Sequence, residues 1–226
     1  MSLDFTWYNQ KTLDAIIGIA EPASFGTDEE TDRNLGETKV WGTETVLNIV
    51  PVRTDDLEWS ISGSYSTNDS EIVDLGPRVE EVHWSLRKGQ PLRVEYDNIV
   101  QNVDAPAGTV PDNDIAVLGV MWPTKLYTAG TRITWRNALT LDLLGEGQAG
   151  HIKASGVSWA TSRRETWPMC FGILDEYNAN GLTNLTPQQS GVCVPTYSQW
   201  GSWTDRADFF RLRSASLSYR LPDGLI

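Results

Sequence analysis

Residues 57–66, LEWSISGSYS, alternate between apolar or aromatic residues and small polar ones. Leu57, Trp59 and Ile61 share one side of an extended chain, and a glutamate and four serines occupy the other. Because successive side chains of a strand point to opposite faces, this period of two predicts a β-strand with one apolar and one polar face. Residues 214–221, SASLSYRL, repeat the pattern and predict a second strand of the same kind.

Weaker alternation elsewhere raises the expected number of strands to about six. The four weaker stretches are residues 3–19, 40–50, 118–135 and 138–151. Two connections are short, residues 51–56 and 136–137. The long connections, rich in Gly, Pro, Asn and Asp, are residues 20–38, 67–117 and 152–206. Short and long connections alternate, which is typical of outer-membrane barrels with short periplasmic turns and long extracellular loops.

Aromatic residues lie beside the short connections. Trp59 follows the first one, Trp135 precedes the second, and Tyr219 precedes Leu221-Pro222, where a third turn is expected. Indole and phenol rings prefer the interface between membrane and water, so this placement favours a membrane barrel. In a soluble β-sandwich the same aromatic residues would form the core. The periodicity alone therefore leaves both folds open.

Composition excludes some classes of protein. No apolar run in the 226 residues approaches the roughly 20 residues of a membrane helix, which excludes a helical membrane protein. The mean hydropathy of −0.32 is compatible with a barrel, whose strands mix lipid-facing and lumen-facing residues. The net charge of −12 argues against a nucleic-acid partner. Acid-rich residues 21–37 are expected in solvated loops, with an acidic surface that meets cations or a partner as the alternative.

The only cysteines, Cys170 and Cys193, lie within one predicted long loop. In an oxidising compartment a disulfide between them would stabilise that loop by about 3 kcal/mol in the chain-entropy model. Two free buried thiols remain an alternative. A metal site is a weaker one, because the two histidines, His83 and His151, are distant in sequence.

Several segments, in order, resemble the C-terminal barrel of SusC/RagA-type TonB-linked outer-membrane proteins. The most specific is TDRADFFRLRSASLSYRLP, with its Arg-Leu pair and final Ser-Tyr-x-Leu-Pro. Upstream come a Tyr-Asn-x-Lys-Thr-x-Asp strand, an Asn-x-Gly strand entry, a Trp-Ser strand and a Lys-x-Gly-x-Pro-Leu-like element. In chain order, the segments are residues 8–16, 34–44, 57–76, 88–92 and 204–222. Together they span most of the chain.

The resemblance implies an all-β fold: a partial antiparallel transmembrane β-barrel of about six strands in hairpins, with long extracellular loops, in the bacterial outer membrane. It implies TonB-dependent import of glycans, peptides or similar nutrients, without catalysis, cofactor or metal. The implied partners are outer-membrane lipid, the rest of the barrel with its plug, the TonB complex acting through that plug, and a SusD-like surface lipoprotein. Residues 1–226 would then be one fragment, without plug, earlier strands or closing strands. The first residues, MSLDFTWY, show no signal peptide, which agrees with an internal piece.

Candidate ligand contacts are Tyr197, Trp200 and Trp203, aromatic side chains in the last long loop that could stack on a glycan or peptide. Packing within the loop is the alternative role. The segment Pro111-Asp112-Asn113-Asp114 lacks the glycines of the family's calcium-type loop, so no metal is expected there.

Two other classes of function compete with transport. A secreted hydrolase would need paired carboxylates such as Glu80 and Glu176, but nothing fixes their separation, and no Gly-x-Ser-x-Gly elbow occurs. A soluble secreted β-sandwich that binds carbohydrate also suits the tryptophan content. The sandwich would bury Trp59, Ile61 and Leu217 in one core, whereas a barrel would turn them outward to lipid and place serines inside.

Overall fold

The fold is described from a computed structural model that covers residues 1–20, 30–76, 81–82 and 86–221. The chain divides into two compact units, the sheet unit and the insert unit. The sheet unit comprises Met1–Leu92, Trp122–His151 and Ala207–Ile226, and the insert unit comprises Arg93–Met121 and Ile152–Arg206. The insert unit is built largely from two of the segments that the sequence predicts to be long connections.

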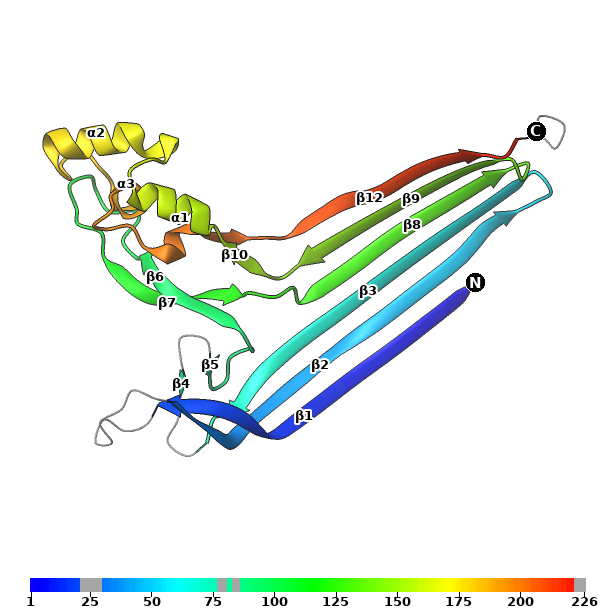
Figure 1. Cartoon of the computed structure of the whole chain (residues 1–226), viewed down its shortest axis with the longest axis horizontal. Coiled ribbons are helices and arrows are strands. Elements are labelled where there is room, and N and C mark those ends of the chain that lie inside the picture. The colour runs from blue at the N-terminus through cyan, green and yellow to red at the C-terminus, as the bar shows by residue number, and fades with distance from the viewer. Residues whose placement is uncertain (21–29, 77–80, 83–85, 222–226) are drawn as a thin grey trace. The chain divides into compact units, whose positions relative to one another are not determined.

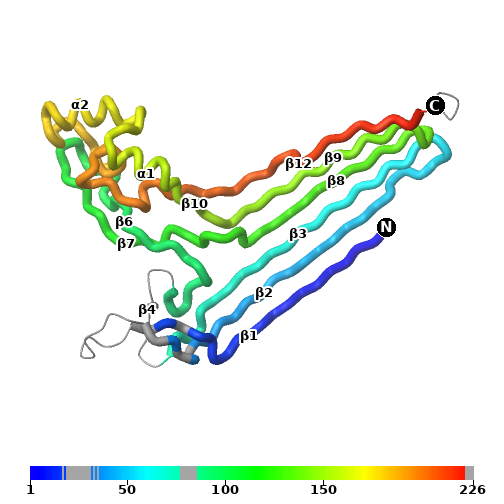
Figure 2. The backbone as a smooth tube through the Cα atoms, viewed as in Figure 1, coloured from blue at the N-terminus to red at the C-terminus, as the bar shows by residue number. Residues whose placement is uncertain are grey.

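Six strands form one antiparallel sheet in the sheet unit. They are β1 (Ser2–Ala20), β2 (Glu30–Arg53), β3 (Leu57–Asp74), β8 (Lys125–Trp135), β9 (Leu139–Ala149) and β12 (Phe209–Tyr219). Their order in the sheet, β1-β2-β3-β8-β9-β12, is their order along the chain (Figure 1). The backbone trace shows the six strands side by side as a meander (Figure 2). The predicted antiparallel sheet of about six strands in hairpins is confirmed.

Both short connections are tight turns at the same end of the sheet (Figure 1). In the β2–β3 turn, the backbone N–H of Thr54 donates to the carbonyl of Leu57 over 2.9 Å. In the β8–β9 turn, Arg136 and Asn137 have φ values of 49° and 52°, the left-handed pair of a type I′ hairpin. Asparagine tolerates this conformation better than most residues, which explains its position there.

Strands β2 and β3 are longer than the alternation predicts. β2 begins at Glu30 instead of residue 40, and β3 continues to Asp74. Charged side chains pair across the extension, where Lys11 Nζ lies 2.8 Å from Glu37 Oε1. Because opposite charges on neighbouring antiparallel strands stabilise the pairing, an acid-rich stretch can form a strand as readily as a loop. Residues 30–38 are therefore strand, whereas residues 21–29 lie outside the described part of the chain.

Buried apolar residues of the sheet unit gather at the end remote from the short turns. Ile72 and Leu75 are buried there, and Leu86 and Leu92 pack against them. Leu86 belongs to β5 (Leu86–Arg87), which pairs with β4 (Glu81–Val82). By contrast, residues 57–66, all of them described, include no buried residue. The middle of this sheet therefore does not enclose an apolar core.

The insert unit combines short strands with short helices. Its strands form two antiparallel pairs, β6 (Val94–Val100) with β7 (Asn113–Val120) and β10 (Ile152–Ala154) with β11 (Thr204–Arg206). Its helices are α1 (Gly156–Arg163), η2 (Pro168–Cys170), α2 (Phe171–Asn180), α3 (Pro187–Cys193) and η3 (Trp200–Trp203). Helical periodicity is scarce in the sequence because each helix is short. Among the described residues, none of the helices has the length and hydropathy to cross a membrane.

Local capping accounts for where two of these helices begin. Ser155 accepts a hydrogen bond from the backbone N–H of Ser158 at the start of α1. Thr186 and Gln189 form a capping box at α3, with the Thr186 side chain bonded to the Gln189 N–H and the Gln189 side chain bonded back. Each cap satisfies N–H groups that the first turn of a helix leaves unpaired.

Candidate functional site

The register of the six strands separates the sheet into an apolar face and a polar face. Ile61 pairs with Thr131, Thr131 with Leu143, and Leu143 with Ala215. One residue further, Ser62, Gly130, Leu144 and Ser214 form the next row. Directly paired residues share a face, so the two rows lie on opposite sides of the sheet. The alternation of β3, β8, β9 and β12 is thus in phase across these four strands, although Leu144 is an apolar residue in the polar row.

Large hydrophobic side chains on the apolar face are exposed. Trp7 is 63% exposed and Leu217 68% exposed, and Phe5, Phe210 and Tyr219 are exposed on the same face. Such a concentration of exposed apolar side chains marks a surface that contacts lipid or another apolar partner. Trp59 and Ile61 are half-buried on this face and, among the described residues, belong to neither buried cluster.

Glycines let two aromatic rings lie flat on the apolar face. The rings of Tyr127 and Phe210 stack with centroids 6.0 Å apart and planes 6° apart. A Cβ added at Gly145 would lie 2.4 Å from the Phe210 ring, and one at Gly147 would lie 2.3 Å from the Tyr127 ring. A larger residue at either glycine would lift one of these rings off the sheet.

The polar face contains an open hollow of about 500 Å³. Its polar lining includes Ser60, Ser62, Arg132, Asp142, Ser214 and Ser216. Within it, Arg132 Nε donates to Asp142 Oδ1 over 2.6 Å. Hydroxyl groups both donate and accept hydrogen bonds, so this surface suits a hydrated polar solute. The serines whose alternation predicts a polar face therefore line a concave part of it.

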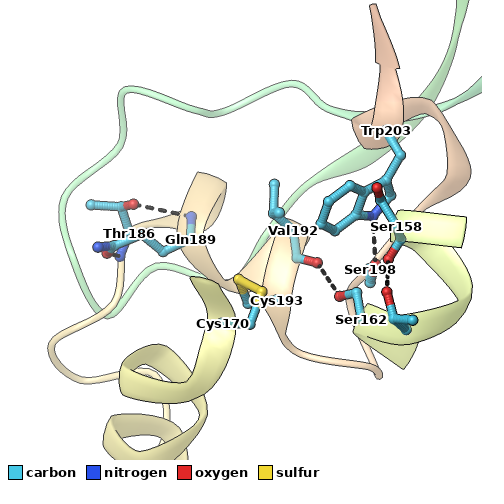
Figure 3. Close-up of a disulfide and its surroundings, with 10 residues drawn as sticks. Ser158, Ser162, Cys170, Thr186, Gln189, Val192, Cys193, Ser198 and Trp203 are labelled. Atoms are coloured by element: carbon cyan, nitrogen blue, oxygen red, sulfur yellow. Dashed lines mark hydrogen bonds between the residues drawn. A yellow bond between two sulfur atoms is a disulfide. The ribbon is translucent and has the colours of Figure 1, made fainter. Parts of the chain in front are cut away.

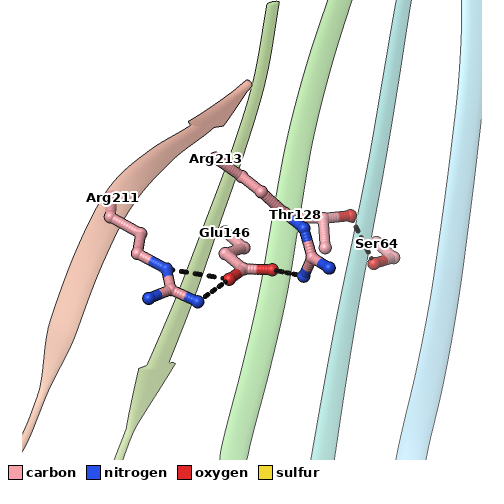
Figure 4. Close-up of polar contacts among 5 residues, drawn as sticks. All are labelled: Ser64, Thr128, Glu146, Arg211 and Arg213. Atoms are coloured by element: carbon pink, nitrogen blue, oxygen red, sulfur yellow. Dashed lines mark hydrogen bonds and ion pairs between the residues drawn. The ribbon is translucent and has the colours of Figure 1, made fainter.

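A second polar group lies further along the same face, where β12 contains a β-bulge. Leu212 pairs with Gly145 and Ser214 with Leu144, so Arg213 is an extra residue that is skipped in the backbone register with β9. Arg211 and Arg213 flank Glu146 from both sides (Figure 4). Arg211 Nε and Nη2 donate to Glu146 Oε1 over 2.9 and 2.5 Å, and Arg213 donates to Glu146 Oε2.

The sequence does not predict this arginine pair as part of a site. Arg211 and Arg213 stand two residues apart in the sequence, which indicates that charged side chains occur here. The sequence does not show which acidic residue of the neighbouring strand lies opposite them. The bulge decides that, because it shifts the register by one residue within the strand.

The structure places Tyr197, Trp200 and Trp203 in the insert unit, but Trp200 and Trp203 contact different partners. Trp200 Nε1 donates to Glu95 over 3.1 Å, and its ring meets Trp159 edge-on with centroids 5.3 Å apart. Trp203 meets Trp167 edge-on at 5.8 Å. Tyr197 is half-buried. Each tryptophan therefore contributes to packing within the unit.

A small pocket of about 200 Å³ lies beside Trp200. Glu95, Lys153 and Thr204 provide its polar lining, and Met121 and Ile152 are among its apolar residues. An aromatic ring next to a carboxylate and an ammonium group is a plausible geometry for a small polar ligand. The candidate contact Trp200 is one of the residues that line this pocket.

The structure joins Cys170 and Cys193 in a disulfide that links η2 to α3 (Figure 3). Both cysteines are buried with Leu174, and Trp167, Ile173 and Val192 pack against them. In the same region Ser162 Oγ donates to the carbonyl of Val192 over 2.9 Å, and Trp203 Nε1 donates to Ser198 over 3.4 Å. The disulfide is thus part of the small core of the insert unit.

Of the two carboxylates considered for hydrolysis, only Glu176 lies in the described part of the chain. Glu80 lies outside the described residues. Glu176 Oε1 accepts hydrogen bonds from Asn184 and Asn180 over 2.6 and 2.7 Å. These two amides, Asn184 first, hold the pKa of the Glu176 carboxyl below its usual range. Glu176 therefore ties the end of α2 to the following loop. In the described part of the chain, no group of three or more His, Cys, Asp or Glu side chains is arranged to hold a metal ion.

Comparisons with known proteins agree with the sequence resemblance. Over 73 residues the chain is 32% identical to TonB-dependent receptor P26 of Formosa agariphila, a match that covers 32% of this chain and 7% of the receptor. Among solved structures, the RagAB peptide importer in its open-open state matches 99% of the chain with a TM-score of 0.71 and 17% identity. Its closed-closed state matches with a TM-score of 0.66 and 16% identity.

These matches define how much of a larger protein the chain represents. The chain spans 26–27% of the length of the matched importer chains. No protein-family model matches it. The resemblance to SusC/RagA-type TonB-linked outer-membrane proteins is confirmed, in sequence by the TonB-dependent receptor and in fold by the RagAB importer.

Proposed function

We propose that this chain is a section of the barrel wall of a TonB-dependent transporter that imports nutrients across the bacterial outer membrane. The observation that carries the proposal is the two-faced sheet. One face exposes Trp7, Phe210 and Leu217, while the other carries a serine-lined hollow. A barrel wall needs this arrangement, with apolar side chains toward lipid and polar side chains toward the lumen.

The main alternative is a soluble β-sandwich that binds carbohydrate. A sandwich requires a second sheet packed about 10 Å from the first, with the apolar faces turned toward each other. Within the described part of the sheet unit, the other strands are only the two-residue pair β4 and β5. Exposure of Leu217 and the half-burial of Trp59 and Ile61 favour the barrel.

In the proposed transporter, the rest of the barrel and the plug come from the remainder of a longer protein. The outer edges of β1 and β12 support this, because a sheet in lipid must satisfy the backbone groups at its edges by pairing with further strands. The chain itself then performs no covalent chemistry. It contributes polar lumen wall from β3, β8, β9 and β12, together with the insert unit as part of the extracellular loops.

The substrate and partners follow from the same assignment. RagAB is named a peptide importer, and peptides or glycans are the proposed substrate class here. A SusD-like surface lipoprotein and the TonB complex are the proposed partners, the latter acting through the plug. Tyr197, Trp200 and Trp203 are the proposed ligand contacts, with the pocket beside Trp200 as the place to look first.

Single-cysteine labelling in the full-length parent tests the topology. Cys170 and Cys193 are first replaced by serine, and then Tyr197 or Thr54 by cysteine. A membrane-impermeant maleimide applied to intact cells is expected to label position 197 and not position 54, because the short β2–β3 turn is periplasmic in this proposal. The reverse pattern contradicts the proposed sidedness. Purification of the parent from the soluble fraction as a monomer without detergent contradicts the barrel.

A further inference from the structure

Arg211 and Arg213 leave a positive charge on the polar face of an otherwise acidic protein. Two guanidinium groups share the single carboxylate of Glu146, so the group carries a net charge of about +1. The chain as a whole has a formal net charge of −12. On an acidic protein, such a cationic group attracts an anion more strongly than the surface around it does.

The arginines are more exposed than the carboxylate that they share. The side chains of Arg211 and Arg213 are 63% and 61% exposed, whereas that of Glu146 is 18% exposed. Each guanidinium has five N–H donors, and the bonds to Glu146 use only some of them. Glu146 therefore positions the two arginines and leaves donor groups facing solvent. Arg211 is further oriented by Phe209, whose ring centroid lies 5.4 Å from the guanidinium carbon.

Hydroxyl groups continue this group across the sheet. Glu146 pairs with Thr128 and Thr128 with Ser64, so all three lie in one row on the polar face. Ser64 Oγ and Thr128 Oγ1 are 2.7 Å apart (Figure 4). Along β3, Ser64 is two residues from Ser62, which lines the serine hollow. The arginines, the hydroxyl row and the hollow thus form one continuous polar track.

We propose that Arg211 and Arg213 form a subsite for an oxyanion, a carboxylate or a sulfate ester, carried by the solute that passes this face. The inference rests on the proposed transport function and specifies its substrate as anionic. Arginine suits this role because its planar fork donates two parallel hydrogen bonds to a carboxylate or sulfate. The extra residue at the bulge puts the second fork beside the first.

Binding to the purified full-length parent in detergent tests the subsite with two matched pairs of probes. One pair is N-acetyl-tetra-alanine with a free C-terminal carboxylate and its C-terminal amide. The other is monosulfated maltotetraose and unsulfated maltotetraose. We expect the parent to bind the anionic member of at least one pair about tenfold more tightly. Preference in the peptide pair identifies a carboxylate, and preference in the glycan pair identifies a sulfate ester.

Three variants test whether the preference for the anionic probe comes from Arg211, Arg213 and Glu146. Arg211→Gln combined with Arg213→Gln is expected to reduce the preference to less than about twofold while leaving binding of the neutral probe unchanged. Glu146→Gln is expected to strengthen binding of the anionic probe about threefold, because it removes the competing carboxylate. Arg53→Gln is the matched control. That arginine pairs with Glu58 at 3.2 Å beside the short turn, so its loss should leave the preference intact.

Equal binding of both members of each pair, or a preference that survives the double replacement, overturns the subsite. Failure of both anionic probes to bind also overturns it. Topology labelling and growth on the transported nutrient judge the transport proposal separately, because neither depends on anion preference. A parent with correct topology and active uptake but no anion preference refutes this inference alone.

Discussion

The sheet unit and the insert unit reach order by different means. Backbone hydrogen bonds between six strands hold the sheet unit together, and none of residues 57–66 at its middle is buried. The insert unit has the usual means of a small soluble domain: a buried core around Cys170 and Leu174, a disulfide and capped helices. The middle of the sheet therefore depends on its surroundings for apolar burial, whereas the insert unit has a core of its own.

The largest expected effect separates the two faces of β3. Ile61→Arg in the full-length parent is expected to cost roughly 2–4 kcal/mol of folding free energy in the membrane, because it places a charge on the lipid side near the bilayer midplane. Its neighbour Ser62→Arg, on the polar face, is expected to fold normally and to alter passage of solute. Urea titration of the barrel folded into liposomes measures both. Equal costs at the two positions contradict the two-faced sheet.

Loss of the disulfide is expected to affect the insert unit alone. Cys170→Ser with Cys193→Ser opens a loop with a sequence separation of 23 residues, which corresponds to about 3 kcal/mol in the chain-entropy model. Hydrogen exchange of the parent should show faster opening at α2 and α3 with β3 and β9 unchanged. Faster exchange throughout the sheet as well would mean that the two units do not unfold independently.

A smaller effect is expected at the capping box of α3. Thr186→Ala removes the side chain that accepts from the Gln189 N–H and is expected to destabilise the insert unit by about 1 kcal/mol. Thr186→Ser keeps the hydroxyl and serves as the control, with a loss of a few tenths of a kcal/mol at most. Hydrogen exchange at α3 measures the free energy of local opening in the two variants. Similar opening in the two variants contradicts a role for the cap.

The smallest expected effect depends on pH. Asn184 and Asn180 lower the pKa of Glu176 in the folded state, so the unfolded chain binds its proton more readily. The stabilisation is therefore fully present above the unfolded pKa of about 4.3 and is lost as the pH falls through the folded value. Exchange protection at the end of α2 should decrease below about pH 4. Glu176→Gln should remove this pH dependence. If exchange protection in this variant still decreases at low pH as in the parent, another group causes the decrease.

Alternation predicts the sheet well because it reports a property of each strand by itself. It places Ser214 and Ser216 on the face opposite Leu217. Both short turns lie within or beside the predicted connections, although β2 continues to Arg53 and shortens the first one. Register is a property of two strands together, so the pairing of Glu146 with Arg211 is not visible in either strand alone. Likewise, Trp200 and Trp203 are neighbours in sequence, yet tertiary packing directs them to Trp159 and Trp167.

Helices of the insert unit escape prediction for a different reason. Helices α1, α2 and α3 have 8, 10 and 7 residues, too few turns for a clear apolar stripe. Their boundaries are set by Ser155, by Thr186 with Gln189, and by the disulfide core. Capping residues are common in loops as well, so they indicate a helix only when tertiary contacts support it.

The bulge at Arg213 also shows how such a strand can change during evolution. If Arg213 is deleted, residues 209–219 alternate without interruption, with Leu212 and Ala215 on the apolar side and Arg211 and Ser214 on the other. A one-residue insertion at this point therefore adds a cation to the polar side without moving any side chain on the apolar side to the wrong face. An insertion with a bulge therefore lets the polar face change while the apolar face keeps its alternation.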